Sequence, residues 1–176
     1  MNEVLNNIIT RRSTRAFKNE PLKKEDLEQI LQAGIYAPSG MNRQTWQFSI
    51  TQNHEKIQHL ARNIANVLNR GDNYNFYEPA AIILVSNDRD NTNGLADCAC
   101  ALENIFLMAN SLGIGSCWIN QLKGICDEPE IRSILNDFNI PENHIVWGIA
   151  ALGKPRDVVP EKEKNRNVIH WIDDEN

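Results

Sequence analysis

The chain has 176 residues and a formal net charge of −5 at pH 7, and 41% of its residues are hydrophobic while 23% are charged. These values are typical of a single globular domain with a substantial core, and they exclude a disordered chain. The acidic balance also argues against a nucleic-acid-binding protein, although a local basic cluster can still bind a small phosphorylated ligand.

The N-terminal part of the chain predicts two helices. Its first segment, MNEVLNNIITRR, lacks the charged start, apolar run and cleavage site of a signal peptide, so we expect a cytoplasmic protein. Residues 3–12 predict a short amphipathic helix, because one stripe carries Val4, Leu5, Ile8 and Ile9. The apolar spacing after Pro21 predicts a second helix, which ends before Pro38.

Four further segments predict strands. Residues 46–52 alternate and are rich in aromatic and β-branched side chains, and residues 114–119 form a shorter strand-like run. The continuous apolar runs 80–86 and 144–153 are typical of strands covered on both faces, so we expect them at the centre of a sheet. Helices are predicted between these strands by apolar residues at helical spacing: Ile57, Leu60, Ile64 and Val67 in one helix, and residues 128–138, opened by Pro129, in another.

The segment from Gly94 to Leu112 is apolar almost all round. Its polar residues, Asp97, Glu103, Asn104 and Asn110, are too frequent for a membrane span, so the pattern predicts a core helix or a helix at a dimer interface. A homodimer explains it best. The last apolar patch, VIHWI (168–172), predicts a terminal strand that can pair with a second subunit, because a long polar connection precedes it.

The familiar signatures of catalysis and metal binding are missing from the sequence. The four cysteines show no ligand spacing with histidine, so we expect neither a metal site nor a disulfide framework, and we expect Cys98 and Cys100 to be buried free thiols. There is no GxSxG, HExxH or Walker motif, and the four histidines are interpreted as surface or packing residues. If the protein is an enzyme, a cofactor supplies its chemistry.

Two basic clusters could bind an anion. Arg11, Arg12, Ser13, Thr14 and Arg15 combine three guanidinium groups with two hydroxyls, which suits phosphate oxygens. The alternative is a solvated basic end to the first helix, favoured by the helix dipole. Lys162, Lys164 and Arg166 form a second group that, alone, is typical of a charged linker. The spacing does not decide whether the two clusters meet.

The segment APSGMNRQTW (37–46) has the Pro, Gly, Ser and Asn of a turn, but a turn does not explain Trp46. Together with RRSTRAF, DCACALENIFLMANSLGIGSCWI and IPENHIVWGIAALGKPR, in this order, it resembles the FMN-dependent nitroreductase family over nearly the whole chain. The resemblance implies an α+β fold, with a mixed, mostly antiparallel central sheet surrounded by helices and an intertwined homodimer. It implies one FMN-binding domain over residues 1–176, of which 156–176 form a C-terminal extension that reaches the partner subunit.

The resemblance also implies which residues bind FMN. The phosphate and ribityl chain would be bound by Arg11, Ser13 and Arg15, by the main chain of Arg12 and by the late pair Lys164 and Arg166. The isoalloxazine ring of the partner's flavin would be covered by Pro38, Ser39, Gly40 and Asn42, with Gln44 and Trp46 anchoring this loop and Thr45 standing where the family usually has proline. A backbone amide near Ile119 and Asn120 would face flavin N5, and Asn75 would contact the ring.

The chemistry implied is the reduction of nitroaromatics, quinones or similar small electron acceptors, with NAD(P)H as co-substrate and a ping-pong mechanism. No catalytic side chain and no metal are implied. About eight residues separate Val85 from the apolar helix, which leaves no room for the additional helices of larger members, so we expect an open site. The alternatives are a specialised flavin enzyme of the same fold, such as a dehalogenase or a dehydrogenase, and a non-catalytic FMN-binding dimer.

Overall fold

A computed structural model describes residues 1–71 and 73–172. The last four residues of the expected C-terminal extension, 173–176, lie outside the described residues. The described part of the chain contains five α-helices, two short 3-10 helices and four β-strands: α1 (Glu3–Thr10), α2 (Lys24–Ile35), η1 (Gly40–Asn42), β1 (Trp46–Thr51), α3 (His54–Val67), β2 (Ala81–Asp88), α4 (Gly94–Ser111), β3 (Gly115–Ile119), η2 (Leu122–Gly124), α5 (Pro129–Asp137) and β4 (His144–Gly153).

The four strands form one sheet in the order β1-β2-β4-β3, so the two continuous apolar runs lie at its centre as predicted. Every neighbouring pair of these strands is antiparallel. The prediction of a mixed sheet is therefore wrong for the four strands; the described residues contain one isolated parallel bridge, between Ser13 and Ser116. Thr51, which ends β1, pairs with Ile82 near the start of β2, so the connection through α3 begins and ends at the same end of these two strands.

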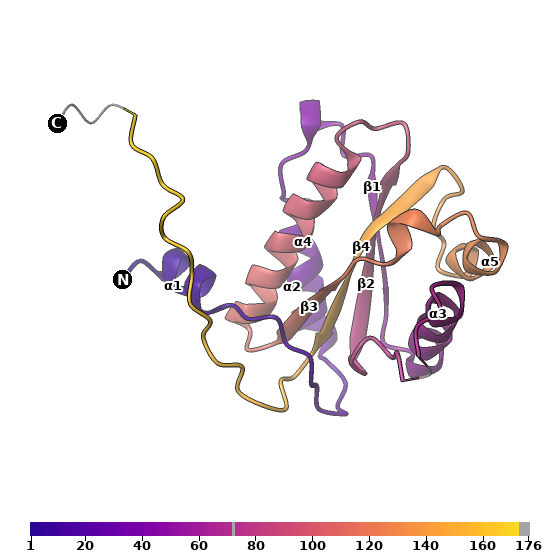
Figure 1. Ribbon diagram of the computed structural model, residues 1–176, viewed down its shortest axis with the longest axis horizontal. Coiled ribbons are helices and arrows are strands. Elements are labelled where there is room, and N and C mark those ends of the chain that lie inside the picture. Colours follow the sequence, from indigo (N-terminus) through magenta and orange to yellow (C-terminus); the bar gives the residue numbers. More distant parts are fainter. Residues whose placement is uncertain (72, 173–176) are drawn as a thin grey trace.

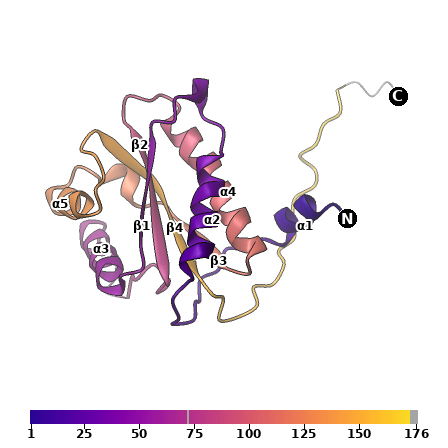
Figure 2. The ribbon, with the colours of Figure 1, turned by 180° about the vertical axis from the view of Figure 1, so that it is seen from behind.

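Helices cover both faces of the sheet. Figure 1 and the reverse view in Figure 2 show α2 and α4 against one face and α3 and α5 against the other. Alternate residues of β2 pack into the two hydrophobic cores, one on each face of the sheet. Ile82 and Leu84 lie in the core with α3 and α5, whereas Ile83 and Val85 lie in the core with α2 and α4. This alternation explains why β2 is a continuous apolar run.

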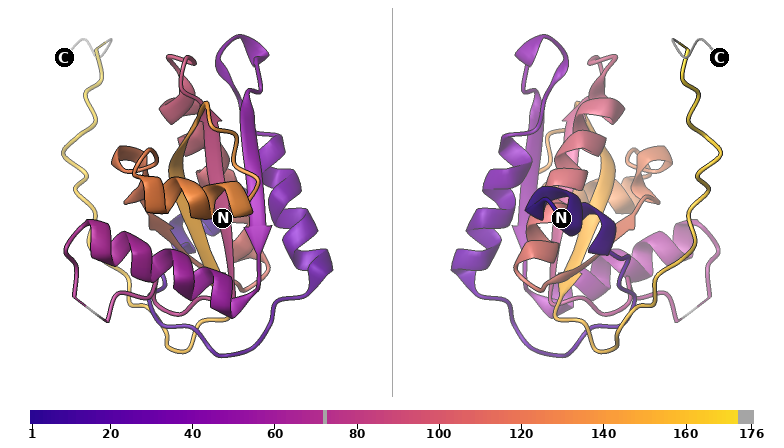
Figure 3. Two further views of the ribbon diagram at one scale, coloured as in Figure 1. Left: turned by 90° about the vertical axis from the view of Figure 1, so that its right-hand side faces the viewer. Right: turned by 90° about the vertical axis from the view of Figure 1, so that its left-hand side faces the viewer.

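Figure 1 shows the N-terminal helix α1 to one side of this layered body, and Figure 3 shows the C-terminal tail running clear of it. Helix α1 ends at Thr10, two residues earlier than predicted, and has no buried residue. Asn7 attaches it to α4, because Asn7 Nδ2 donates to the carbonyl of Leu107 and Asn110 Nδ2 donates to Asn7 Oδ1 at 2.7 Å. Four apolar side chains of α1 remain exposed: Val4, Leu5, Ile8 and Ile9.

The strand predicted for residues 168–172 is not present in the single chain. Beyond Gly153 the chain leaves the sheet and runs past α1 into solvent, so no strand of its own domain is within reach (Figure 1). The tail exposes several large apolar side chains, including Trp171 at 78% exposure. Pairing of this segment with a second subunit stays a prediction.

Helix α4 separates its two neighbouring cysteines. Cys98 is buried as expected, but Cys100 is exposed, and the prediction that both are buried is wrong. Residues two apart on a helix point to different faces, and only the face of Cys98 meets the sheet. Among the described helices none is both long and apolar enough to cross a membrane.

Candidate functional site

The basic segment after α1 lies beside the start of β3 and the end of β4. Thr14 N–H donates to the carbonyl of Ser116 at 2.8 Å, and Phe17 forms an antiparallel bridge with Pro155. A Cβ added to Gly115 would lie 2.6 Å from the hydroxyl of buried Thr14, so glycine is needed for this close approach. The segment is therefore held extended, and its alternate side chains point to opposite sides.

The three guanidinium groups have different surroundings. Arg12 turns back onto the end of α1, where it donates to the carbonyls of Ile9 and Arg11, and it lies 3.7 Å from the carboxylate of Glu161. Arg11 forms an ion pair with Glu103 at 3.4 Å, whose side chain is 51% exposed. The helix-end interpretation thus describes the Arg12 side chain well. It does not account for the other two arginines.

Arg15 forms no hydrogen bond or ion pair with any residue that the structure describes; its guanidinium carbon lies 5.9 Å from the ring centroid of Tyr77. Burial raises the pKa of the Cys117 thiol in β3, and the positive charges of Arg15 and Arg11 oppose that rise. These two predicted phosphate ligands lie on either side of Ser13, whose bridge to Ser116 places this region beside β3 at the edge of the sheet.

Residues 74–78 form the next wall of this region. Phe76, Tyr77 and Glu78 all have left-handed backbone, with φ of 56°, 69° and 54°, which is uncommon for residues other than glycine. Asn75 closes this turn, because its carbonyl accepts from Glu78 N–H and its Oδ1 accepts from Tyr77 N–H, each at 3.0 Å. The Asn75 side chain expected to contact the ring thus has a structural hydrogen bond within its own turn.

The end of β3 meets this turn. Ile119 is buried, Asn120 is exposed just after the strand, and the next residue, Gln121, accepts a 2.9 Å hydrogen bond from the hydroxyl of Tyr74. Burial raises the pKa of Tyr74 to about 12, so its phenol keeps the proton that it donates at neutral pH. The structure therefore brings the segments 11–15, 74–77 and 119–121 to one side of the molecule.

The loop that contains Pro38, Ser39, Gly40 and Asn42 lies elsewhere. Figures 1 and 3 show η1 at one end of the molecule and the basic segment at the other. Within the loop, the N–H of Gln44 donates to Ser39 Oγ at 3.3 Å and its side-chain amide donates to Asn42 Oδ1 at 2.8 Å. Trp46 begins β1 and packs against Phe48, with ring centroids 5.9 Å apart. One chain thus does not bring this loop to the basic segment.

A buried polar network fixes the loop, and sequence reasoning missed it. Asp97 Oδ1 accepts a 2.9 Å hydrogen bond from the backbone N–H of Gly40, and Asp97 Oδ2 accepts from Asn91 Nδ2 at 3.0 Å. Thr45 donates to Asn87 Oδ1 at 2.7 Å. The one signal in the sequence is an acidic residue in the first turn of a mostly apolar helix, and it does not indicate which loop the carboxylate meets.

Lys164 and Arg166 stand on the exposed tail. Within residues 1–71 and 73–172, neither forms a hydrogen bond or ion pair with the basic segment, whereas Glu161 of the same tail contacts it through Arg12. The single chain therefore does not bring the two basic clusters together as expected for one phosphate site.

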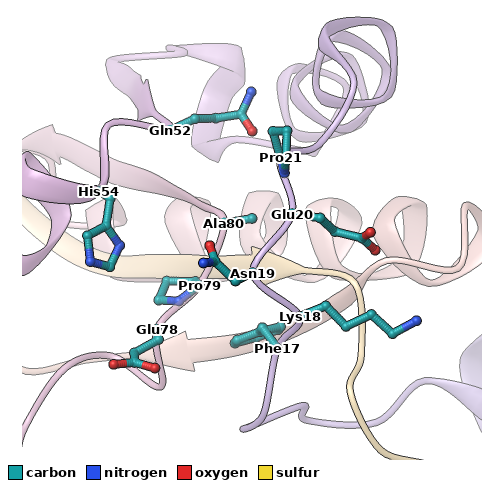
Figure 4. A pocket seen from close by; sticks show the side chains of 10 residues that line it. All are labelled: Phe17, Lys18, Asn19, Glu20, Pro21, Gln52, His54, Glu78, Pro79 and Ala80. Atoms are coloured by element: carbon teal, nitrogen blue, oxygen red, sulfur yellow. The ribbon is translucent and has the colours of Figure 1, made fainter.

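Two pockets lie near the basic segment. One, of about 400 Å³, is lined by residues 17–21, Gln52, His54 and residues 78–80, and it carries charges of both signs (Figure 4). The other, of about 520 Å³, includes Arg12 and Thr14. Neither is lined by Arg11, Ser13 or Arg15; the second is lined by Thr10, Arg12 and Thr14, as expected if alternate residues of the extended segment face opposite sides.

Comparison with known proteins identifies the family. A model of the nitroreductase family matches residues 8–154. The chain belongs to this family. A protein of Archaeoglobus fulgidus provisionally named NADH dehydrogenase/NAD(P)H nitroreductase is 32% identical over 164 residues, which cover 89% of this chain and 88% of that protein.

Solved structures of nitroreductases agree with the fold. A nitroreductase from Bacteroides fragilis, crystallised with bound FMN, is 39% identical and has a TM-score of 0.91, covering 98% of this chain and 100% of its own. A nitroreductase from Desulfitobacterium hafniense, also with bound FMN, is 28% identical with a TM-score of 0.87, covering 98% of this chain and 99% of its own.

The residues of this chain suit the phosphate of FMN. A phosphate monoester carries close to two negative charges and needs cationic donors. Arg15 has no carboxylate partner among the described residues, and the exposed ion pair of Arg11 with Glu103 is of a kind that contributes little stability, so Arg11 can exchange its partner for a phosphate at small cost. Ser13, between them, adds a hydroxyl on a fixed extended backbone.

Proposed function

We propose that this protein is an FMN-dependent oxidoreductase that uses NAD(P)H to reduce nitroaromatics, quinones or similar electron-poor acceptors by a ping-pong mechanism. The observation that carries the proposal is the row of Arg11, Ser13 and Arg15 on an extended segment beside β3, with the charge of Arg15 unpaired among the described residues. The two related structures that contain FMN support the same choice of cofactor.

In this proposal the chain binds and orients the cofactor. Arg11, Ser13 and Arg15 hold the phosphate through charge-assisted hydrogen bonds, and the backbone at Ile119 and Asn120 meets the ring edge. Tyr74 and Gln121 fix the wall beside it through their 2.9 Å hydrogen bond. When bound, FMN supplies the redox chemistry, taking a hydride from NAD(P)H and passing electrons to the acceptor.

An open site fits the proposed range of acceptors. The connection from Asp88 at the end of β2 to Gly94 at the start of α4 is short and contains no helix. The chain thus has no additional element there to shape a pocket around one substrate, and NAD(P)H and the acceptor can use the same open face in turn.

A homodimer completes the site in this proposal. The loop at residues 38–42 and the basic segment 11–15 lie at opposite ends of the molecule, so the loop would cover the flavin of a second subunit (Figure 1). The exposed apolar residues of α1 and of residues 168–172 would be buried in that dimer, and the partner's extension would bring in its own Lys164 and Arg166. The four free thiols fit the reducing cytoplasm, where we place the enzyme.

The proposed function is tested by the pigment of the purified protein. We expect a yellow protein whose chromophore is released by heat and co-migrates with FMN, at one FMN per chain. A colourless protein that does not take up added FMN would contradict the proposal. A flavin that binds but is not reduced by NADH or NADPH would favour the non-catalytic alternative, and reduction without turnover of nitroaromatics or quinones would favour a specialised enzyme of the same fold.

A further inference from the structure

Asp97 is a carboxylate that lies buried beside the loop of residues 38–45. It lies in the first turn of α4 and is only 4% exposed. Burying a charge is costly unless hydrogen bonds compensate it, and both oxygens of Asp97 are used: Oδ1 by the N–H of Gly40 and Oδ2 by the amide of Asn91. The first of these bonds reaches 57 residues back along the chain, to the loop of residues 38–45.

This loop has a backbone that needs support. Met41, Asn42 and Gln44 have φ of 53°, 54° and 50°, in the left-handed region that non-glycine residues seldom adopt. Gly40 is pressed so closely onto the residue before α4 that an added Cβ would collide with the side chain of Asn93. Left-handed residues of this kind persist only where the surrounding structure holds them.

Both ends of the loop are attached to the same buried cluster. Asn91 Nδ2, which donates to Asp97, also donates to the hydroxyl of Thr45 at 3.0 Å. Thr45 in turn donates to buried Asn87. Gly40 at one end and Thr45 at the other are thereby connected through Asp97 and Asn91, and the residues between them span a fixed distance.

We propose that Asp97 is a positioning residue that holds the loop 38–45 in the shape required to cover the flavin of the second subunit. That the loop covers a flavin rests on the proposed function, whereas the hydrogen bond from Gly40 N–H to Asp97 is present in the chain itself. The charge strengthens the bond to the N–H of Gly40. An asparagine at position 97 can accept only one of the two bonds, because its amide nitrogen would face a donor from either Gly40 or Asn91.

The first experiment needs no flavin. Amide hydrogen exchange of the flavin-free protein should show Gly40 protected in the wild type and exchanging at least about tenfold faster in Asp97→Asn, as expected for loss of a charged hydrogen bond. Asp90→Asn is the matched control, because Asp90 is exposed and only its backbone N–H is bonded. Unchanged exchange at Gly40 would overturn the proposal.

A second variant guards against a chain that does not fold. Thr45→Val keeps the shape of the side chain but removes the hydroxyl that joins Asn91 and Asn87. It should speed exchange across residues 40–44 while leaving residues 82–85 of β2 protected. Loss of protection in β2 to the same degree would mean a general loss of structure, and the positioning role would be wrong.

Flavin binding separates positioning from general weakening. Because the loop is proposed to cover the ring, Asp97→Asn should weaken FMN and riboflavin by a similar factor. Arg15→Ala should weaken FMN far more than riboflavin, which has no phosphate. An Asp97→Asn effect confined to FMN would contradict a role through the loop.

Mixed dimers test on which subunit the loop acts. A dimer that combines one Arg15→Ala chain with one Asp97→Asn chain contains one site with an intact arginine and an intact loop, so half of the sites should bind FMN with wild-type affinity. If each loop covers the flavin of its own chain, both sites carry one defect and no wild-type site is found. If no wild-type site is found but Gly40 exchanges fast in Asp97→Asn, the dimeric site of the proposed function is wrong and the positioning of the loop by Asp97 still holds. If Gly40 exchanges as slowly in Asp97→Asn as in the wild type, the positioning role itself is wrong.

Discussion

Arg15 and Tyr77 lie against each other, with the guanidinium carbon 5.9 Å from the centre of the phenol ring. The contact joins the basic segment after α1 to the left-handed turn at residues 76–78. An aromatic face attracts a cation without neutralising it as a carboxylate would, so the charge of Arg15 stays available to an anion.

Replacement of Arg15 by alanine should weaken FMN binding by about tenfold to a hundredfold, the value of one charge-assisted hydrogen bond. Riboflavin should lose far less affinity, because it offers no phosphate to lose. Fluorescence titration of both ligands against both proteins gives a four-point cycle, with Arg62→Ala on the exposed face of α3 as the control. Equal losses for the two ligands would make Arg15 a structural residue.

Gly115→Ala should displace the basic segment from β3. The added Cβ would lie 2.6 Å from the hydroxyl of Thr14, and such overpacking typically lowers the free energy of unfolding by about 1–3 kcal/mol. FMN affinity should fall with it, because Ser13 and Arg15 flank Thr14. Gly124→Ala, with open space around its Cβ, is the matched control for both the unfolding and the titration experiments. Unaltered stability in Gly115→Ala would show that the segment is not held there.

Removal of the residues after Asn167 should shift the protein from dimer to monomer and reduce its retention of FMN. The removed segment carries Val168, Ile169, Trp171 and Ile172, which the single chain leaves exposed. Sedimentation velocity over a range of concentrations measures the shift. Val158→Ser, at an equally exposed position of the connecting stretch, should leave the dimer intact. A truncated protein that stays dimeric would rule out the tail as part of the interface.

His144 should make the protein less stable in acid. The side chain is buried, with Nδ1 3.0 Å from Ser86 Oγ, and burial lowers its pKa below the ordinary 6.5, with Arg132 acting in the same direction and Asp88 opposing them. The unfolded chain therefore binds a proton at His144 more readily than the folded chain does. The contribution of neutral His144 to the free energy of unfolding is complete above pH 6.5 and is lost as the pH falls towards the folded pKa. Urea unfolding on both sides of this pH, with His144→Gln and the exposed His59→Gln as a pair, should show a flatter pH dependence only for the first. An unchanged slope in His144→Gln would contradict the assignment.

The elements of the fold could be predicted from the sequence because they repeat a local pattern. The apolar run at residues 144–153 coincides with β4. The apolar runs of β2 and α4 also end within two residues of the positions predicted for them. The family resemblance implied the mostly antiparallel pairing, whereas the residue pattern alone does not give the direction, because a strand, a helix and a strand in succession are also typical of parallel sheets. The terminal strand at residues 168–172 stays a prediction, because its apolar pattern says nothing about which chain supplies the neighbouring strand and the structure describes a single chain.

Sequence motifs could name the residues of the candidate site, but they could not predict how these residues are arranged in space. Gly40 and Asp97 are 57 residues apart, and no local pattern indicates that they meet. The turn at Phe76, Tyr77 and Glu78 lacks glycine, which is the usual sign of a left-handed backbone. Thr45 stands where the family resemblance implies a proline, and in the structure its hydroxyl donates a hydrogen bond to Asn87 that holds the loop.

The central claim is that a flavin bound by this chain carries electrons from NAD(P)H to a separate acceptor. Anaerobic addition of NADH or NADPH to the flavin-loaded protein should bleach the flavin absorption band. After the nicotinamide is removed, a nitroaromatic or quinone alone should restore the band. A band that bleaches only when the acceptor is also present, or that NAD(P)H never bleaches, would contradict the account.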